Sequence, residues 1–268
     1  MTKLYLRYLL LSILLSGVLY YSLQNRMIFQ GAPVEKEHKW RLDEVQPARE
    51  FEIAFDSSMT INVVQFMPKD SITKGIVLYF HGNRRNIQRY VRSSKVFTEL
   101  GYECWVPDYP QYGKSTGELN VENLHEIALQ IYRMANARVA ADSIVLYGKS
   151  LGTGIASYLA SKRDARALLL ETPYYSLSSL TSEYAFMLPT PLMIRNNLEN
   201  GYYLGLTDEP VTIWHGTRDK VIPLQEPLLL TRYFKPGDTL IVVPGAGHNG
   251  IPRSDMFKAS LRQILERP

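Results

Sequence analysis

The chain has a single cysteine, Cys104, among its 268 residues, so it cannot form an internal disulfide. This cysteine lies in the apolar run Tyr102–Val106, which indicates a buried strand and a place in the core. No pair of Cys or His has metal-ligand spacing, and neither a P-loop nor a dinucleotide-binding glycine pattern occurs. We therefore expect neither a metal nor any other cofactor.

Charge of one sign is not in large excess. Lys and Arg number 30 against 26 Asp and Glu, which gives a formal net charge of +4. A mild basic excess of this size is not a concentrated basic face, so nucleic acid is not expected as a partner. Internal repeats and low-complexity tracts are also lacking, and the 46% hydrophobic content can fill the core of one large or two small domains.

One segment lacks charge altogether. No charged residue lies between Arg7 and Arg26, and Tyr8–Leu23 is almost continuously apolar. About 18 uncharged residues in a helix span roughly 27 Å, close to the ~30 Å hydrocarbon core of a bilayer. Residues 1–26 are therefore predicted to form a single-pass membrane anchor. A cleaved signal peptide is the alternative, but no alanine precedes Ala32 to form an A-x-A cleavage site.

The rest of the chain, after a linker over residues 27–50, has the pattern of an α/β domain over residues 51–268. Two β-rich segments within Phe51–Phe66 flank the turn-type cluster Asp56-Ser57-Ser58, which predicts an antiparallel hairpin. Later apolar runs of strand length lack period-2 alternation, as strands covered on both faces do: 75–80, 102–106, 143–147, 165–170, 211–214 and 240–243.

Helix-like segments alternate with these runs. Val121–Ala137 has its apolar residues on one stripe, and further helices are expected from Ser150 to about Lys162 and from about Arg253 onward. This alternation predicts a mostly parallel, doubly wound sheet. Residues 174–208 break the rhythm with many Tyr, Leu and Met, and we expect them to form a small cap over the active site.

Ser150 is the candidate nucleophile. It lies in the pentapeptide GKSLG (148–152), between a predicted strand and a predicted helix, where a sharp turn would expose its hydroxyl. The flanking glycines relieve the crowding at such a turn. A serine hydroxyl is a weak nucleophile near neutral pH, so acyl transfer also needs a base, an acid that orients the base, and donors for the oxyanion. A glycine-rich turn with an idle serine is the alternative.

Asp219 and His248 follow in the order that this chemistry requires. Each lies on a loop after a predicted strand, at the sheet edge where open α/β sheets place their ligands. Asp219 is predicted to orient the imidazole, and His248 to act as general base and then as general acid. Taken alone, Asp219 has the alternative of a turn or capping role, and His248 that of a solvated loop histidine.

The oxyanion donors are predicted from the strand ends as well. His81-Gly82-Asn83 follows the run 75–80, and we predict the backbone N–H groups of Asn83 and Leu151 as the oxyanion hole. Leu151 also lies at a helix N-terminus, which favours negative charge. His81 is predicted to be structural, because the last strand already supplies the base.

Five motifs in this order resemble the α/β-hydrolase superfamily: HGN (81–83), DYPQYGKSTG (108–117), GKSLG (148–152), HGTRD (215–219) and GAGHN (245–249). Over about residues 45–268 the chain is similar to small, N-terminally anchored ABHD-type serine hydrolases of the serine aminopeptidase-like branch. The resemblance implies cleavage of an ester, thioester or amide bond in a small-molecule or lipid substrate through an acyl-serine intermediate. It does not identify the substrate, since this branch includes esterases, lipases and thioesterases.

The chain departs from the usual motifs at two places. Arg84 and Arg85 follow HGN where related sequences carry small residues, and Pro110 and Gln111 replace Arg and Gly in the second motif. With Lys149, the two arginines form either a positive rim for an anionic substrate or ordinary solvated charge. Two other functions stay open: a binding or scaffold protein that keeps the fold without turnover, and an acyltransferase. The complete triad argues against a scaffold.

The membrane anchor generates a prediction about topology. Lys3 and Arg7 precede the apolar segment and Arg26 follows it, which leaves only a weak bias toward a cytoplasmic N-terminus. We expect the catalytic domain of a bacterial protein of this kind to lie outside the inner membrane. A reporter enzyme that is active only outside the cytoplasm, fused after Pro268, should be active in whole bacterial cells. A silent reporter on an intact fusion protein would contradict this topology.

Overall fold

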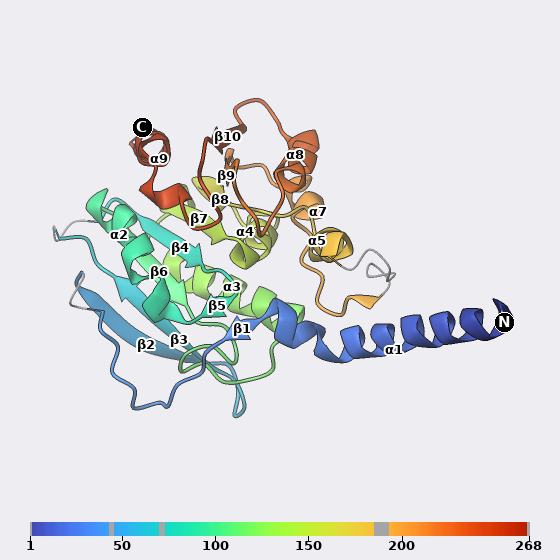
Figure 1. Ribbon diagram of the computed structural model, residues 1–268. Coiled ribbons are helices and arrows are strands. Elements are labelled where there is room, and N and C mark those ends of the chain that lie inside the picture. The colour runs from blue at the N-terminus through green and yellow to red at the C-terminus, as the bar shows by residue number, and fades with distance from the viewer. Residues whose placement is uncertain (1, 43–45, 70–72, 185–192, 267–268) are drawn as a thin grey trace.

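A computed structural model describes residues 2–42, 46–69, 73–184 and 193–266 (Figure 1). The apolar runs of the sequence form one sheet, because their side chains are buried on both faces. In order across the sheet the strands are β10 (Thr239–Val243), β9 (Val211–Gly216), β8 (Ala167–Glu171), β7 (Ile144–Lys149), β4 (Ile76–Phe80), β6 (Glu103–Pro107), β3 (Thr60–Phe66) and β2 (Ala48–Ala54).

The strand directions follow the predicted pattern. All neighbours from β10 to β6 are parallel, whereas β3 is antiparallel to β6 and β2 is antiparallel to β3. The antiparallel pair β2–β3 is the hairpin expected around Asp56. The mostly parallel sheet of the α/β-hydrolase fold is therefore confirmed.

Helices cover both faces of the sheet. On one face lie α2 (Val91–Glu99) and α9 (Asp255–Leu265), whose phenylalanines share a buried cluster with alternate residues of β4. On the other face lie α3 (Val121–Asn136) and α4 (Leu151–Ala160), which ends two residues before the predicted Lys162. Because both faces are covered, every residue of the central strands is buried, which explains why the sequence shows no alternation.

The predicted cap has two described helices. They are α5 (Leu177–Tyr184) and α7 (Asn200–Leu204), and residues 185–192 of the predicted cap lie outside the described ranges. A short α8 (Gln225–Leu230) follows β9. These helices lie at the edge of the sheet where the parallel strands end (Figure 1).

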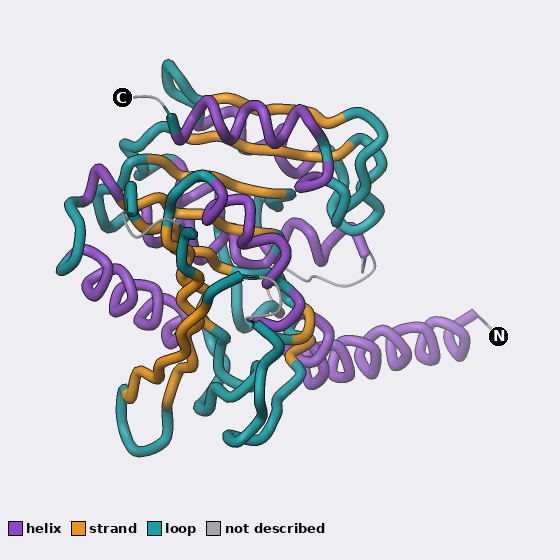
Figure 2. Tube along the Cα trace, turned by 90° about the vertical axis from the view of Figure 1, so that its left-hand side faces the viewer, coloured by secondary structure: helices purple, strands orange, loops and turns teal. Residues whose placement is uncertain are grey.

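The N-terminal segment forms one long helix, α1 (Thr2–Ile28), which continues two residues past the predicted end of the anchor. Its N-terminal part projects away from the domain (Figures 1 and 2), with nearly all described side chains exposed. Its C-terminal part packs on the domain through Gly17, Tyr20 and Gln24, which are buried and share one helix face. Within the predicted linker, after the end of α1, β1 (Gln30–Gly31) pairs in parallel with β5 (Arg84–Arg85).

α1 is long and apolar enough to cross a membrane over Leu4–Ile28. An N-terminal signal sequence would meet the same criterion, so the anchor stays a prediction.

The packing of α3 on α4 generates a prediction about acid stability. The His125 ring stacks on Tyr158 at 3.4 Å between ring centroids, and burial, together with the charge of Lys162, lowers the pKa of His125 from 6.5 to about 4. The unfolded chain therefore takes up this proton first, and stability that is present above pH 6.5 is lost as the pH falls toward 4. In His125→Phe the free energy of unfolding should fall less between these pH values.

The difference from wild type should be below about 3 kcal/mol, because the ring is partly exposed and solvent screens its charge. Urea unfolding of the full-length protein in micelles at pH 7 and pH 5 measures it, with His38→Phe as the control at an exposed histidine. An unchanged pH dependence in His125→Phe would contradict the assignment.

Candidate active site

Ser150 lies at a tight turn between β7 and α4. Its backbone has φ 52° and ψ −117°, a conformation that residues other than glycine rarely adopt. The turn is held because Ser150 N–H donates to the Glu171 carbonyl at 2.9 Å. A Cβ at Gly148 would lie 2.6 Å from the Gly152 oxygen, and one at Gly152 would lie 2.0 Å from the Phe80 oxygen. The two glycines of GKSLG are therefore required by close backbone approach.

The three predicted triad residues meet at this turn. His248 Nε2 lies 3.0 Å from Ser150 Oγ, and His248 Nδ1 lies 2.8 Å from Asp219 Oδ2. Ser150 stands at the N-cap position of α4, yet its side chain makes no capping hydrogen bond, so the hydroxyl is directed to the imidazole. The three come from loops after β7, β9 and β10, as the sequence predicted. Their catalytic roles remain a prediction.

The carboxylate of Asp219 is held as an anion. Its side chain has no exposed surface, and burial alone would raise its pKa, but hydrogen bonds from His248 and from the Val221 and Ile222 N–H groups lower the pKa below its usual value. A second imidazole, that of His215, lies nearby, with its Nε2 3.8 Å from Asp219 Oδ2. The same nitrogen lies 2.9 Å from the Ile222 carbonyl oxygen. Burial lowers the pKa of His215, so this ring is neutral near pH 7.

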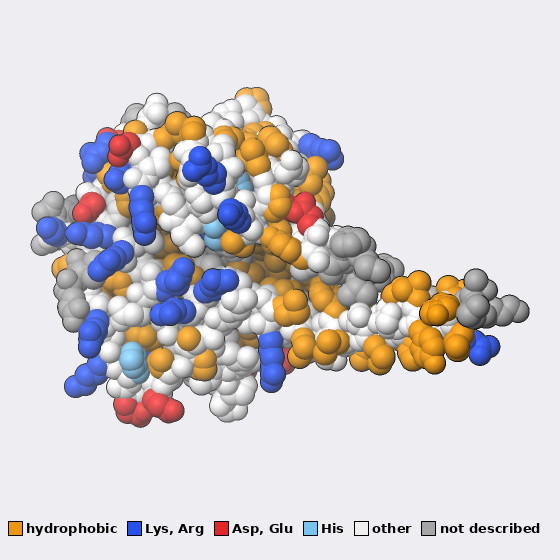
Figure 3. Space-filling model, viewed as in Figure 1, with side chains coloured by type: hydrophobic (Ala, Val, Ile, Leu, Met, Phe, Trp, Pro, Cys, Tyr) orange, Lys and Arg blue, Asp and Glu red, His pale blue; other side chains and the backbone are white. Residues whose placement is uncertain are grey.

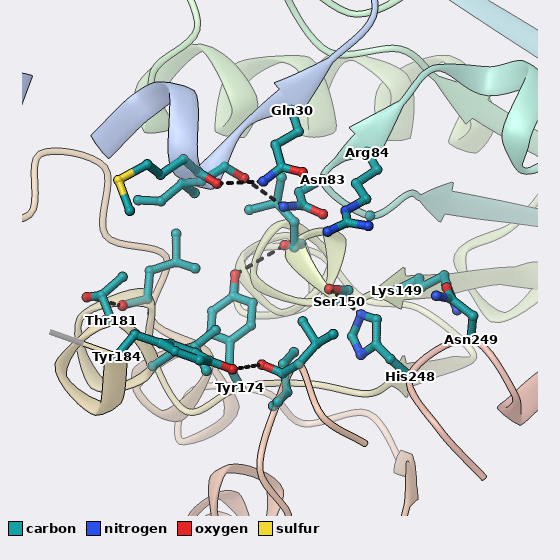
Figure 4. A pocket seen from close by; sticks show the side chains of 18 of the residues that line it. Gln30, Asn83, Arg84, Lys149, Ser150, Tyr174, Thr181, Tyr184, His248 and Asn249 are labelled. Carbon is teal, nitrogen blue, oxygen red and sulfur yellow. Dashed lines mark hydrogen bonds between the residues drawn. The ribbon is translucent and has the colours of Figure 1, made fainter. Parts of the chain in front are cut away.

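The predicted oxyanion residues, Asn83 and Leu151, both line the pocket that contains Ser150. Figure 4 shows Asn83 across from Ser150. Leu151 is the first residue of α4, whose first-turn N–H groups have no partner within the helix. The Asn83 carbonyl accepts from Gln30 N–H and from the Tyr112 hydroxyl, both at 2.9 Å. Its side chain donates to the Ile28 carbonyl at 3.0 Å. Asn83 is thus fixed on three sides by groups outside its own loop.

His81 occupies a buried site beneath this loop. Its ring stacks on Tyr90 and contacts Tyr109, and its Nε2 lies 3.2 Å from Asp108 Oδ1. Asp108 also accepts from Ile87 N–H, and burial is the main cause that raises its pKa. His81 has no exposed surface and does not line the pocket, consistent with the structural role predicted for it.

Lys149 differs from the expectation for a solvated charge. Its side chain is 7% exposed and its ammonium pairs with the carboxylate of Glu171, which is fully buried. The two residues are neighbours in the register of β7 and β8. Tyr147 donates to the same carboxylate. Lys149 is therefore compensated and adds no free charge to a positive rim, whereas Arg84 and Arg85 are exposed and Arg84 reaches the pocket.

The pocket above Ser150 has a volume of about 330 Å³. Its lining is mostly apolar, and Figure 4 shows Ser150 and His248 on one side of the space, with Tyr174, Thr181 and Tyr184 on another. The wall that the sequence did not predict comes from α1 and β1: Tyr20, Gln24, Met27, Ile28 and Gln30. One signal was available, because Gln24 is a polar residue in an apolar helix and shares a helix face with Tyr20 and Gly17.

Comparison with known proteins agrees with this fold. A family model described as serine aminopeptidase, S33, matches residues 71–199, which include Asn83 and Ser150. Protein ABHD12B of Homo sapiens is 25% identical over 222 residues, which are 72% of this chain and 60% of that protein. Lysophosphatidylserine lipase ABHD12 of Danio rerio is 28% identical over 55% of this chain and 36% of that protein.

Among solved structures, an esterase of Pyrococcus furiosus has a TM-score of 0.69 at 16% identity and covers 89% of this chain and 98% of its own. At this identity the likeness shows the fold alone. Together with the family match and the relatives, it confirms the predicted resemblance to ABHD-type α/β-hydrolases.

The buried ion pair next to Ser150 generates a prediction about stability. Glu171→Gln should lower the free energy of unfolding by about 3–5 kcal/mol, because it leaves the Lys149 ammonium buried without its counter-charge. Replacing both residues by methionine should recover most of this loss, since a buried ion pair often contributes little against apolar residues of similar volume.

Urea unfolding of the full-length variants in micelles measures the effect. Glu99→Gln provides the matched control, because Glu99 is exposed, its partner Lys95 is half-buried, and ion pairs near the surface contribute at most about 1 kcal/mol. Equal losses in Glu171→Gln and Glu99→Gln would show that the buried pair has no special role.

Proposed function

We propose that this ABHD-type α/β-hydrolase is a serine hydrolase that cleaves the ester bond of an acyl-bearing substrate through an acyl-serine intermediate. The observation that carries the proposal is the position of His248, whose two ring nitrogens lie 3.0 Å from Ser150 Oγ and 2.8 Å from Asp219 Oδ2. This is the arrangement that a general base needs in order to accept a serine proton while a carboxylate stabilises the resulting imidazolium.

The reaction proceeds in two acyl transfers. His248 Nε2 accepts the Ser150 proton as Oγ attacks the carbonyl carbon, and the tetrahedral oxyanion is stabilised by the N–H groups of Asn83 and Leu151. The carbon–oxygen bond to the alcohol then breaks, and the alcohol leaves with the proton from His248. In the second transfer, His248 takes a proton from water, the resulting hydroxide attacks the acyl-serine, and the acid leaves while Ser150 regains its proton.

An ester with an apolar acyl group fits the pocket best. Most of its lining is apolar, so burying an acyl chain there removes hydrophobic surface from water. The names of the relatives, which include a lysophosphatidylserine lipase, support a lipid ester. A thioester would fit the same machinery. The proximity of Ser150 to His248 also favours turnover over a scaffold role, since a scaffold gains nothing from an activated hydroxyl.

The helix α1 is proposed to anchor the enzyme in a membrane. Its exposed part is apolar, and exposed leucines and tyrosines follow one another from Leu4 to Leu19. In water such a surface would be unfavourable, whereas a bilayer would bury it. The catalytic domain would then stand at the membrane surface.

The triad generates a prediction about reactivity. The full-length protein should be labelled by a fluorophosphonate probe and should hydrolyse a short p-nitrophenyl ester. Ser150→Ala should abolish labelling, because the probe phosphonylates the serine oxygen. His248→Ala and Asp219→Ala should each lower kcat/KM by about a thousandfold or more, since the remaining groups cannot activate the hydroxyl.

His81→Ala and His215→Ala test whether the effect is specific to His248. Neither ring contacts Ser150, so any loss in these variants should follow the loss of folded protein, which circular dichroism reports. Labelling that persists in Ser150→Ala, or an unlabelled wild type, would refute the hydrolase assignment.

A further inference from the structure

Helix α1 forms part of the wall of the pocket that contains Ser150. Tyr20, Gln24, Met27 and Ile28, from its last turns, line the same space as Ser150 and His248. Across this space stands α5, which contributes Leu177, Leu180, Thr181 and Tyr184. The acyl pocket is therefore built between a helix of the predicted cap and the helix proposed to anchor the chain.

Hydrogen bonds seat this end of α1 on the domain. The side chain of Gln24 is buried, donates to the Met193 carbonyl at 3.1 Å and accepts from Arg195 N–H at 2.8 Å. Asn25 accepts from the Asn196 side chain at 2.9 Å. The Gln24 side-chain oxygen is buried and needs the Arg195 N–H as its partner, so these bonds favour one register of α1 on the domain.

The mouth of the pocket is bordered by exposed apolar side chains. Met27 is 58% exposed, Tyr184 64% and Val221 46%, and all three line the pocket. Figure 3 shows apolar side chains along α1 and around the hollow between α1 and the domain. Single exposed apolar residues are ordinary on a protein surface, but these three border one pocket, and Met27 belongs to α1, whose exposed surface is apolar.

We propose that the pocket takes the acyl chain of an ester that resides in a membrane, and that the chain enters from the bilayer between α1 and α5. The proposal rests on the proposed hydrolase function and adds the route and the source of the substrate. Along this route the acyl chain passes from the exposed face of α1 to its pocket face, so it need not leave an apolar environment before its carbonyl reaches Ser150.

A bilayer is a better source than free solution on two grounds. The wall that the chain would follow is the continuation of the helix whose exposed surface a membrane would cover. The alternative, a water-soluble ester, would leave the exposed rim of Met27, Tyr184 and Val221 in contact with water. It would also give no role to α1 in the pocket.

The experiment uses the full-length protein in phosphatidylcholine nanodiscs with two substrates, p-nitrophenyl acetate in water and p-nitrophenyl palmitate in the disc. Met27→Trp narrows the entrance on the α1 side, so the ratio of kcat/KM for palmitate to that for acetate should fall about tenfold or more. Leu19→Trp is the matched control, because Leu19 is 60% exposed on the same helix and does not line the pocket. It should leave both activities unchanged.

A second measurement does not depend on the variant's stability. A long-chain fluorophosphonate with a diazirine at the end of the chain is added to the wild type, irradiated, and its cross-links are mapped by mass spectrometry. Cross-links to residues 20–28 of α1 are expected. Palmitate ester held in separate vesicles should also be hydrolysed more slowly than the same ester in the disc that holds the enzyme.

The outcomes separate the two proposals. If the probe does not react with Ser150, the hydrolase function itself is wrong. If the probe reacts with Ser150 but no cross-link falls on α1, the hydrolase function stands and entry along α1 is overturned. The same conclusion follows if Met27→Trp, like Leu19→Trp, keeps the wild-type ratio of kcat/KM for palmitate to that for acetate. Equal rates for ester in the disc and ester in separate vesicles would overturn the bilayer as the source.

Discussion

The chain reverses from a buried strand into a buried helix at Ser150, and its backbone there has a positive φ that few side chains tolerate. The surrounding structure maintains this conformation. Gly148 and Gly152 leave room for carbonyls that any Cβ would strike, and Ser150 N–H is bound to β8 through the Glu171 carbonyl. The strain directs the hydroxyl out of the helix cap and toward His248. The turn thus depends on the sheet register and on the two glycines, and the position of the proposed nucleophile depends on the turn.

The Lys149–Glu171 ion pair lies next to the same turn and helps to stabilise it. Two opposite charges in neighbouring strands cost desolvation, and this cost is offset only while both are present and hydrogen-bonded. Because Lys149 precedes Ser150 in the chain and the Glu171 carbonyl accepts from Ser150 N–H, the ion pair and Ser150 are connected through the same two strands. This arrangement favours a rigid turn at Ser150 over a flexible one.

Much of the fold, and the positions of the three residues proposed as the triad, could be predicted from the sequence, because their signals are local. The strands are continuous apolar runs, and Ser150, Asp219 and His248 each stand a few residues after one of them. The burial of Lys149 could not be predicted, since it depends on β8 lying beside β7 and on a register that brings Glu171 opposite. The docking of α1 on the domain could not be predicted for the same reason, because the hydrogen-bond partners of Gln24 lie about 170 residues further along the chain.

The bonds around Asn83 have a consequence for the order in which the site is assembled. Its carbonyl is held by Gln30 and Tyr112, and its side chain by Ile28, so three separate stretches of chain must meet before the loop is fixed. α1 precedes every strand of the main sheet during synthesis, and the loop residues that dock on it come later. The loop that carries Asn83 therefore depends on the docking of residues 28–30 as well as on the main sheet, and a chain in which they are not docked would lack the proposed oxyanion geometry.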